Sequence, residues 1–340
     1  MKKVTNTKQS YLKRLGDELF YNGITYASIK KNRNKDTDYL HTQQIEGTEL
    51  SAGLGEIQGL RDEQEDHLSV HSAHSFNLLD SKQQKDLLQK CFDKMILQYG
   101  STPDCGSTAC IAIAFQEKNT LHLISANMGD SSAFVVILES NPSGQYHPVL
   151  VERINKVLHN MEEDPEWLEM NAGRVRRVND TLALTRSIGD ADTKEADLLY
   201  NKHYSHQNDP DIDIDEIPLK SNQIALLLQM CDGGTEKDYD GEPCLNETKI
   251  GEIIATYYTQ RDDYPDFLSE IIFQLIKTAF NHQNNTQNGS QDNISMALIP
   301  IENHQPPVMS LLFDGHGGDA VSKGLGRDFS GFKAFESRKK

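Results

Sequence analysis

Residues 310–320 read SLLFDGHGGDA, an apolar run that ends in an aspartate and passes into two glycine steps around a histidine. The apolar run begins at residue 308 and is long enough to form a strand that is buried on both faces. A strand that ends in a carboxylate fixes the position of its oxygens, and the neighbouring glycine lets other groups approach closely. Taken alone, the pattern is also typical of an ordinary turn, because Asp and Gly are common turn residues.

The same pattern recurs where other apolar runs begin or end. It is found in GLRDEQEDHLSV (59–70), LLLQMCDGG (226–234) and GSQDNISMALI (289–299), and more weakly in ISANMGDSSAFVV (124–136). Several carboxylates gathered at one place would repel one another, and burying them without a counter-charge is costly. Hard divalent cations such as Mg²⁺ and Mn²⁺ would remove that cost, because they prefer oxygen ligands. The repetition therefore favours one shared metal site over five unrelated turns.

The apolar periodicity predicts an α+β fold with strands in runs and a few long helices. Strands are expected at 67–70, 108–115, 121–128, 133–138, 224–230, 293–299 and 308–313, and helices around 87–99 and 266–280. We expect residues 51–340 to form one domain and residues 1–50 to form an N-terminal extension. Within the extension, Tyr11, Leu12, Leu15 and Leu19 have helical spacing, and 30–44 resembles an exposed loop.

Composition limits the classes of function. The chain has 340 residues and a formal net charge of −17, which argues against a nucleic-acid partner because such proteins need a basic face. No apolar run approaches the length of a membrane span, and the N-terminus lacks the apolar core of a signal peptide. The five scattered cysteines indicate thiols in a reducing, cytoplasmic compartment, although secretion without a signal peptide stays open.

Seven motifs together resemble those of the metal-dependent serine/threonine phosphatases of the protein phosphatase 2C type. They are GLRDEQED, GSTACIAIAF, SANMGDSSAFVV, LALTRSIGD, MCDGG, GSQDNIS and LLFDGHGG, and they extend over about residues 51–335. The resemblance implies a central β-sandwich flanked by helices, with two Mn²⁺ or Mg²⁺ ions at one end. It also implies that a hydroxide bound to these metals hydrolyses phosphoserine and phosphothreonine on phosphoprotein substrates.

The resemblance implies a set of metal ligands. Asp314 would bridge both ions, and Asp232 and Asp292 would complete the protein ligands of one of them. Glu65 and the backbone carbonyl of Gly315 would bind the other.

Four further residues are implied to act around the ions. Asp66 would hold metal-bound waters, and Asp130 would serve a weaker third ion. Arg61 would bind two phosphate oxygens, which a guanidinium does better than a lysine, although an ordinary surface arginine is the alternative. His316 would be the general acid that protonates the departing serine or threonine oxygen.

Some positions depart from the family pattern. Ser132 stands where an arginine is usual, and Glu236 stands where a shorter acid is usual. Cys231 replaces the serine common before the DG aspartate, and we expect it to be inert. Arg186 and Asp190 of the TRSIGD motif are retained, and we expect them to brace the neighbouring flap.

The DGHGG segment also stands in an unusual place, because in the family it follows shortly after the RxxxED segment. Here it comes after the last predicted strand, so we expect a transposed, permutation-like strand order. The segment could dock in its own molecule or in a neighbour, giving a monomer or a strand-swapped dimer. A catalytically weak binding or scaffold protein with the same fold is the alternative function.

Overall fold

The computed structural model describes residues 40–46, 50–57, 65–73, 76–171, 177, 182–200, 209–237, 243–285 and 292–329. The predicted N-terminal helix around 11–19 and the candidate catalytic residue Arg61 lie outside these residues.

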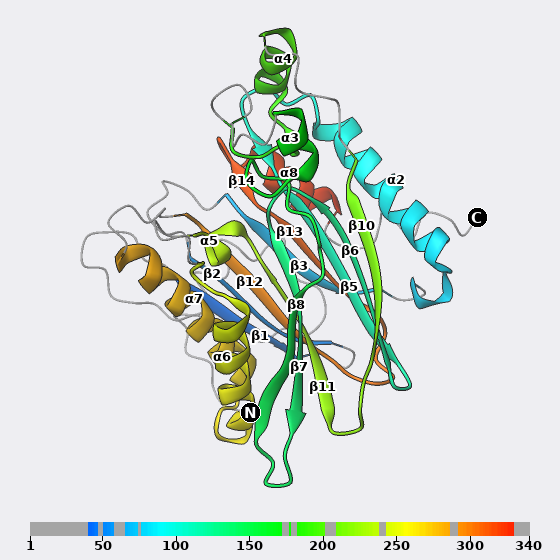
Figure 1. Cartoon of the computed structure of the whole chain (residues 1–340), viewed down its shortest axis with the longest axis vertical. Helices are drawn as coiled ribbons and strands as arrows, with labels where there is room; N and C mark the ends of the chain where they lie inside the picture. The colour runs from blue at the N-terminus through cyan, green and yellow to red at the C-terminus, as the bar shows by residue number, and fades with distance from the viewer. Residues whose placement is uncertain are drawn as a thin grey trace.

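The described strands form two large sheets and a small one (Figure 1). Sheet A has the order β1 (Leu40–Glu46), β2 (Ser51–Ile57), β12 (Ile294–Ile301), β11 (Gln223–Met230), β7 (Ser132–Ser140) and β8 (Tyr146–Arg153). Sheet B has the order β10 (Asp211–Pro218), β6 (Thr120–Met128), β5 (Ala109–Glu117), β13 (Val308–Phe313) and β3 (His67–Ser72). Three two-residue strands form sheet C, in the order β14 (Gly315–His316), β4 (Gly106–Ser107) and β9 (Ile188–Gly189).

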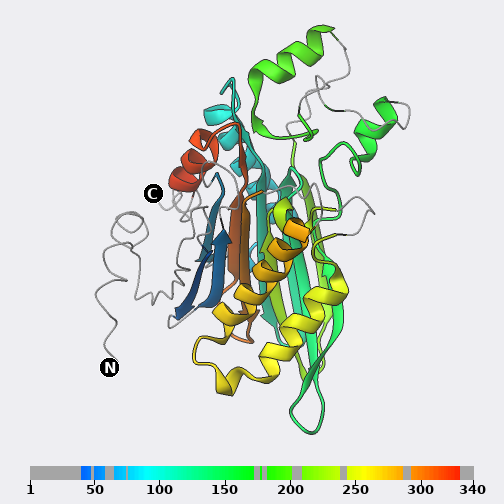
Figure 2. The same ribbon diagram turned by 90° about the vertical axis from the view of Figure 1, so that its left-hand side faces the viewer.

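Helices cover the outer faces of both large sheets (Figures 1 and 2). Sheet A packs against α6 (Glu247–Thr259) and α7 (Phe267–Asn285), and sheet B packs against α2 (Ser81–Tyr99) and α8 (Ala320–Phe329). The short elements are η1 (Phe76–Leu78), α3 (Pro165–Met170), α4 (Ala191–Tyr200), α5 (Asp232–Thr235) and η2 (Arg261–Asp263). The result is a four-layer arrangement of helices, sheet, sheet and helices, so the predicted α+β sandwich flanked by helices is confirmed.

Strand β7 shows why the segments predicted as strands consist almost entirely of apolar residues. Phe134, Val136 and Leu138 face the helices on sheet A, whereas the alternate residues Ala133 and Val135 face the other sheet. A strand that is buried on both faces needs apolar side chains at every position. Alanines also line the layer between the sheets, which allows the two sheets to pack closely.

Strand β13 lies between β5 and the edge strand β3 in sheet B, antiparallel to both strands of the same chain. All six of its residues are buried. Ser310 donates a hydrogen bond to the Oε1 atom of Gln229 on sheet A, and the Nε2 atom of Gln229 donates to the carbonyl of Cys110 at 2.8 Å. Because buried polar groups need partners, this network ties β13 to both sheets in one register.

The sequence predictions for the secondary structure are mostly confirmed. All seven predicted strands and the two helices predicted within the described residues are present, with ends that differ by up to six residues at the start of α2 (Ser81 against the predicted 87). The exposed loop predicted at 30–44 is wrong for residues 40–44, because these belong to β1, which pairs with β2 at the edge of sheet A (Figure 2). Polar side chains suit such an edge strand, so its sequence resembles a loop. We therefore propose that the domain begins no later than Leu40.

Candidate metal centre

The strand registers bring the predicted acidic residues to one end of the sandwich. Asp314 follows β13, and Asp66 precedes β3, whose first residue pairs with the last residue of β13. Asp232 follows β11, and Asp292 precedes β12, whose start pairs with the end of β11. Asp130 follows β6, whose end pairs with the start of β5. Antiparallel pairing thus gathers carboxylates from distant parts of the chain.

The backbone of the DGHGG segment is held from two sides. The amide of Thr108 donates to the carbonyl of Asp314 at 2.8 Å, and the amide of Asp314 donates to the Thr108 hydroxyl at 3.3 Å. A Cβ atom at Gly315 would lie 2.5 Å from the carbonyl oxygen of Glu65. Only glycine permits this approach, which places the two predicted ligands side by side.

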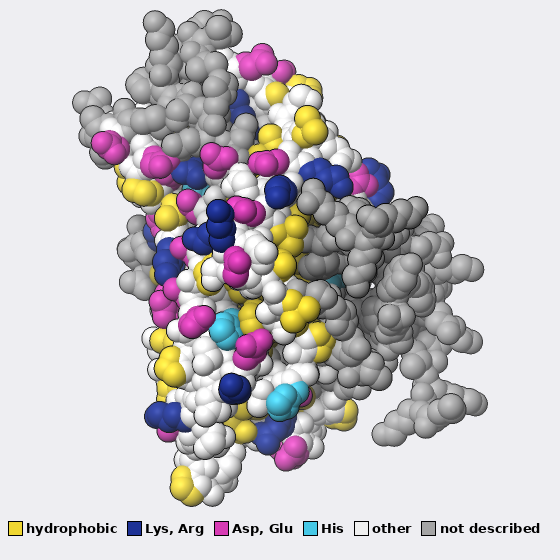
Figure 3. All heavy atoms as spheres, turned by 90° about the vertical axis from the view of Figure 1, so that its right-hand side faces the viewer, with side chains coloured by type: hydrophobic (Ala, Val, Ile, Leu, Met, Phe, Trp, Pro, Cys, Tyr) yellow, Lys and Arg dark blue, Asp and Glu magenta, His cyan; other side chains and the backbone are white. Residues whose placement is uncertain are grey.

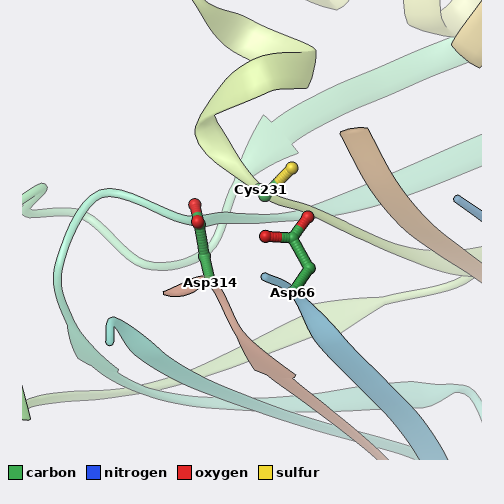
Figure 4. Close-up of side chains that lie close together, drawn as sticks. All are labelled: Asp66, Cys231 and Asp314. Atoms are coloured by element: carbon green, nitrogen blue, oxygen red, sulfur yellow. The ribbon is translucent and has the colours of Figure 1, made fainter. Parts of the chain in front are cut away.

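Two groups of potential metal ligands share Asp314. In one, the ligand atoms of Asp66, Cys231 and Asp314 lie within 4.8 Å of one another, and in the other those of Asp130, Asp232 and Asp314 do so. Figure 4 shows the first group gathered where β3 begins, β13 ends and α5 starts. The shared carboxylate is the arrangement expected of a residue that bridges two ions.

The other two predicted carboxylate ligands lie outside these two groups. Oε1 of Glu65 accepts a hydrogen bond from the amide of Gly318 at 2.6 Å, so this side chain reaches the DGHGG loop. The amide of Glu65 donates to Oδ1 of Asn293 at 2.9 Å, which joins it to the QDN segment. Asp292 lies close enough to raise the pKa values of several carboxylates of the two groups.

The electrostatics of the site fit divalent cations. Burial, with the charges of neighbouring carboxylates, raises the pKa of Asp66 to about 6 and that of Asp130 to about 7. Burial and then carboxylate repulsion raise the pKa values of Asp232 and Asp314 well above the ordinary value. Among the described residues, no donor with good hydrogen-bond geometry reaches either oxygen of Asp66 or Oδ1 of Asp232, although the side chains of Ser295 and Cys231 lie close enough to Asp66 to oppose the rise of its pKa. Buried oxygens that repel one another and lack donors are the donor set that Mg²⁺ or Mn²⁺ prefers.

These pKa shifts predict how the stability of the metal-free protein depends on pH. The folded-state pKa values of Asp66 and Asp130 exceed the unfolded value of 3.8, so the folded state binds more protons between about pH 4 and 7. The free energy of unfolding should therefore fall as the pH rises through this range. We expect an unfolding midpoint in EDTA that is roughly 5 °C higher at pH 5 than at pH 7.5.

Two controls accompany this measurement. Excess Mn²⁺ should stabilise the protein more at pH 7.5 than at pH 5, because cations bind the ionised carboxylates. Asp130→Asn should flatten the pH dependence in EDTA. A midpoint that rises with pH in EDTA would contradict the assignment of these groups.

His316 lies beside the carboxylate groups and is paired with Asp190. Nε2 of His316 donates to Oδ2 of Asp190 at 2.7 Å, and the Ser187 hydroxyl donates to the same oxygen at 2.5 Å. Burial favours the neutral form of Asp190, but the hydrogen bond and charge of His316, with help from Ser187 and Lys194, hold its pKa below the usual value. Sheet C brings the two residues together. Its strand β4 (Gly106–Ser107) pairs on one side with β14, which contains His316, and on the other with β9, which directly precedes Asp190.

Arg186 contacts three segments of the chain, while its expected role in bracing a flap stays a prediction. Its guanidinium donates to Glu166 of α3 at 2.9 Å and to the backbone carbonyl of Asp209 at 2.9 Å, and it lies 3.6 Å from Asp211 of β10. It therefore connects the segment around α3 with the edge of sheet B. Asp190, expected to share this role, instead contacts His316.

A cavity of about 410 Å³ opens beside the second carboxylate group. Asp130, Ser132, Asp232 and Glu236 are part of its lining, so two of the three positions that depart from the family pattern, Ser132 and Glu236, face it. Arg153, Arg177 and Lys237 line it as well, and Glu163 lies 3.2 Å from Arg153 and 3.3 Å from Lys237.

Two further residues near the centre were given no role from the sequence. Cys231, expected to be inert, belongs to the group with Asp66 and Asp314, and burial followed by the charges of these carboxylates raises its pKa well above the ordinary value. Burial and then Asp66 raise the pKa of Glu56 to about 7. Glu56 is the one charged residue in β2, which was the signal available in the sequence.

Three features of the described residues concern the environment of the protein, namely its surface charge, its helices and its cysteines. On the face shown in Figure 3, acidic and basic side chains of the described residues are interspersed rather than segregated. No helix in the described ranges has the length and apolar character needed to cross a bilayer. All five cysteines are free thiols, four of them buried and Cys105 partly exposed.

Comparison with known proteins identifies relatives in rice, Oryza sativa subsp. japonica. "Probable protein phosphatase 2C 62" is 31% identical over 145 residues, which are 42% of this chain and 44% of that protein. "Probable protein phosphatase 2C 58" is 31% identical over 133 residues, which are 38% of this chain and 32% of that protein. The chain thus matches less than half the length of these curated relatives.

Two crystal structures of phosphatases from Toxoplasma gondii resemble the chain more distantly. One has a TM-score of 0.36 and 17% identity, and the match covers 80% of this chain and 71% of the other. The second has a TM-score of 0.38 and 10% identity, with 83% and 92% covered.

The family model described as "Protein phosphatase 2C" matches residues 5–237. This range is more than half of the chain and contains the segments that carry Asp66, Asp130 and Asp232, whereas Asp292 and Asp314 lie beyond it. The chain belongs to the protein phosphatase 2C family.

Proposed function

We propose that this protein hydrolyses phosphoserine and phosphothreonine on protein substrates with the help of two Mn²⁺ or Mg²⁺ ions. The observation that carries the proposal is the position of Asp314 in both groups of carboxylate ligands. A shared carboxylate is what a pair of ions a few Å apart requires. Family membership and the 31% identity to proteins named as phosphatases support the same reaction.

The acidic residues would hold the ions in the following way. Asp314 would bridge them, with Asp232 and Asp292 on one side and Glu65 and the carbonyl of Gly315 on the other. When bound, the ions supply Lewis acidity that activates water and neutralises charge on the phosphoryl group. Asp66 and Asp130 lie close enough to orient water or to hold a weaker third ion.

The remaining chemistry falls to residues of the chain itself. His316 would donate a proton to the serine or threonine oxygen as it leaves phosphorus, because an unprotonated alkoxide is a poor leaving group. Arg61 would bind the phosphate oxygens through its guanidinium. The cavity beside Asp130 and Asp232 would receive the substrate segment next to the phosphorylated residue.

A metal-dependence assay tests the proposal. The purified chain should hydrolyse a phosphothreonine peptide and 4-nitrophenyl phosphate in the presence of Mn²⁺, and EDTA should abolish turnover of both. Adding back Mn²⁺ should restore it. If no divalent cation supports turnover although the protein is folded, the scaffold function replaces this proposal.

The pair of His316 and Asp190 leads to a further prediction. We expect Asp190→Asn to lower turnover of a phosphoserine peptide by about 10–100-fold, because His316 loses the carboxylate that orients its proton. Turnover of 4-nitrophenyl phosphate should change little, because nitrophenolate leaves without protonation.

A double variant provides the control. Asp190→Asn combined with His316→Gln should be no slower than His316→Gln alone, because both changes remove the same proton transfer. If the double variant lost turnover by the product of the two single losses, or if Asp190→Asn slowed both substrates equally, Asp190 would not act through the proton of His316.

We also propose that the strand order is transposed relative to the family. Support comes from the position of β13 between β3 and β5 and from a family match that ends at residue 237. A monomer with β13 docked in its own chain is the simplest assembly.

A further inference from the structure

We propose that Cys231, Asp66 and Asp314 form a binding site for a thiophilic divalent cation such as Cd²⁺ or Zn²⁺. The inference rests on the proposed function in one respect, namely that Asp314 would be shared with the phosphatase ions. A soft cation bound here would therefore compete with Mn²⁺ for that carboxylate.

The three ligand atoms are already gathered. They lie within 4.8 Å of one another, and each comes from the end of a different strand, namely β3, β11 or β13 (Figure 4). The thiol of Cys231 is fully buried, and its sulfur lies within 4.8 Å of an oxygen of each of the two carboxylates. Two carboxylates and one sulfur are three of the four ligands of a tetrahedral Zn²⁺ or Cd²⁺ site, and water can supply the fourth.

Hydrogen bonds around the sulfur suit a metal-bound thiolate. The amide of Ser295 donates to Sγ of Cys231 at 3.1 Å, and Sγ donates to the carbonyl of Asn293 at 3.3 Å. When a cation binds, the thiol proton would be released to solvent and the metal–sulfur bond would take its place. The Ser295 amide would remain as a donor to the thiolate, and such a partner orients the ligand.

The carboxylate of Asp66 independently indicates a cation. This residue is only 6% exposed, and no donor with good hydrogen-bond geometry reaches either oxygen among the described residues, although the side chains of Ser295 and Cys231 lie close by. Its carboxylate points toward the space between Cys231 and Asp314 (Figure 4). A buried carboxylate without donors is costly, and a cation at this position would offset that cost.

The sulfur determines which cation would be preferred. Thiolates bind Zn²⁺ and other soft ions, whereas Mg²⁺ and Mn²⁺ prefer oxygen. The serine common at this position in the family offers only a hydroxyl. Replacing Cys231 by serine should therefore remove the soft-ion site while keeping the size of the side chain.

A spectroscopic titration tests the inference. Cd²⁺ added to the metal-free full chain should produce the ultraviolet thiolate-to-metal charge-transfer band, saturating at one ion per chain. In Cys231→Ser this band should be lost, and Cd²⁺ should bind at least about 100-fold more weakly, since even residues that only orient ligands contribute 10–100-fold. Cys105→Ser is the matched control, because Cys105 is the partly exposed thiol; it should keep the band.

Asp66→Asn provides a second variant if Cys231→Ser does not fold, and it should weaken Cd²⁺ binding by about tenfold or more. The inference is overturned if the wild-type chain shows no band, if the band persists in Cys231→Ser, or if it depends on Cys105 instead. Failure of the proposed function has a different signature, which is a normal Cd²⁺ band in a protein without Mn²⁺-dependent turnover.

Discussion

Replacing Asp314 by asparagine should lower Mn²⁺-dependent turnover of a phosphothreonine peptide by about a thousandfold or more. The carboxylate belongs to both ligand groups, so its loss would disturb both ions at once. Metal ions contribute several kcal/mol to stabilising charge in the transition state, and each 1.4 kcal/mol corresponds to about tenfold in rate. Initial rates at saturating Mn²⁺, with both a peptide and 4-nitrophenyl phosphate, measure the effect.

The folded state of this variant can be checked separately. In EDTA, Asp314→Asn should unfold at a higher temperature than the wild type, because one of several mutually repelling buried carboxylates has become neutral. Its stabilisation by Mn²⁺ should be largely lost. Asp319→Asn is the matched control in the same loop, where Asp319 pairs with Lys323, and it should stay within a few-fold of wild-type turnover. Near-normal activity of Asp314→Asn would remove the basis of the two-ion assignment.

Replacing His316 by glutamine should lower turnover of a phosphoserine peptide by about 10²–10⁴-fold. The expected loss depends on the leaving group, because a serine alkoxide needs a proton and nitrophenolate does not. Turnover of 4-nitrophenyl phosphate should therefore fall much less. Steady-state rates on the two substrates at the same Mn²⁺ concentration give the ratio directly.

The matched control is His122→Gln. His122 stacks on Phe115 and lies 3.3 Å from Glu216 in sheet B, outside both ligand groups. It should leave both rates within a few-fold of wild type. An equal loss on both substrates in His316→Gln would mean that His316 supports the centre in some way other than as a proton donor.

The interior strands of the two large sheets could be predicted from the sequence, whereas the edge strand β1 and helix α8 could not. Strands such as β7 and β11 contain long apolar runs, because both faces are buried along most of their length, and they were predicted almost to their ends. The edge strand β1, which has the sequence LHTQQIE, pairs on one side only, so its composition resembles that of a loop. Helix α8 was missed because it contains Gly324 and Gly326, which lower helix propensity.

Packing explains why α8 tolerates these glycines. A Cβ atom at Gly324 would lie 2.5 Å from the ring of Tyr99, and one at Gly326 would lie 2.2 Å from that of His67. These contacts involve residues more than 200 positions away, so no local pattern reveals them.

For the site, motif resemblance identified the acidic strand ends and assigned them to two ions, but it did not place Cys231 in a group with Asp66 and Asp314. The resemblance assigned Cys231 no role, because a serine is common at that position, whereas the register of β11 against β12 and of β13 against β3 places its sulfur beside two carboxylates. The contact between His316 and Asp190 depends on the three short strands of sheet C. Two-residue strands leave no periodic pattern in a sequence.

The position of β13 affects how the protein is made. Synthesis proceeds from the N-terminus, so β3 and β5 are both made at least 190 residues before β13, the strand that separates them in sheet B. A nascent chain that ends before residue 308 lacks the pairing partner of β3 and of one edge of β5, and it also lacks Asp314. Catalytic competence would then be acquired in a single late step, when the growing polypeptide supplies the strand that joins β3 to the sheet.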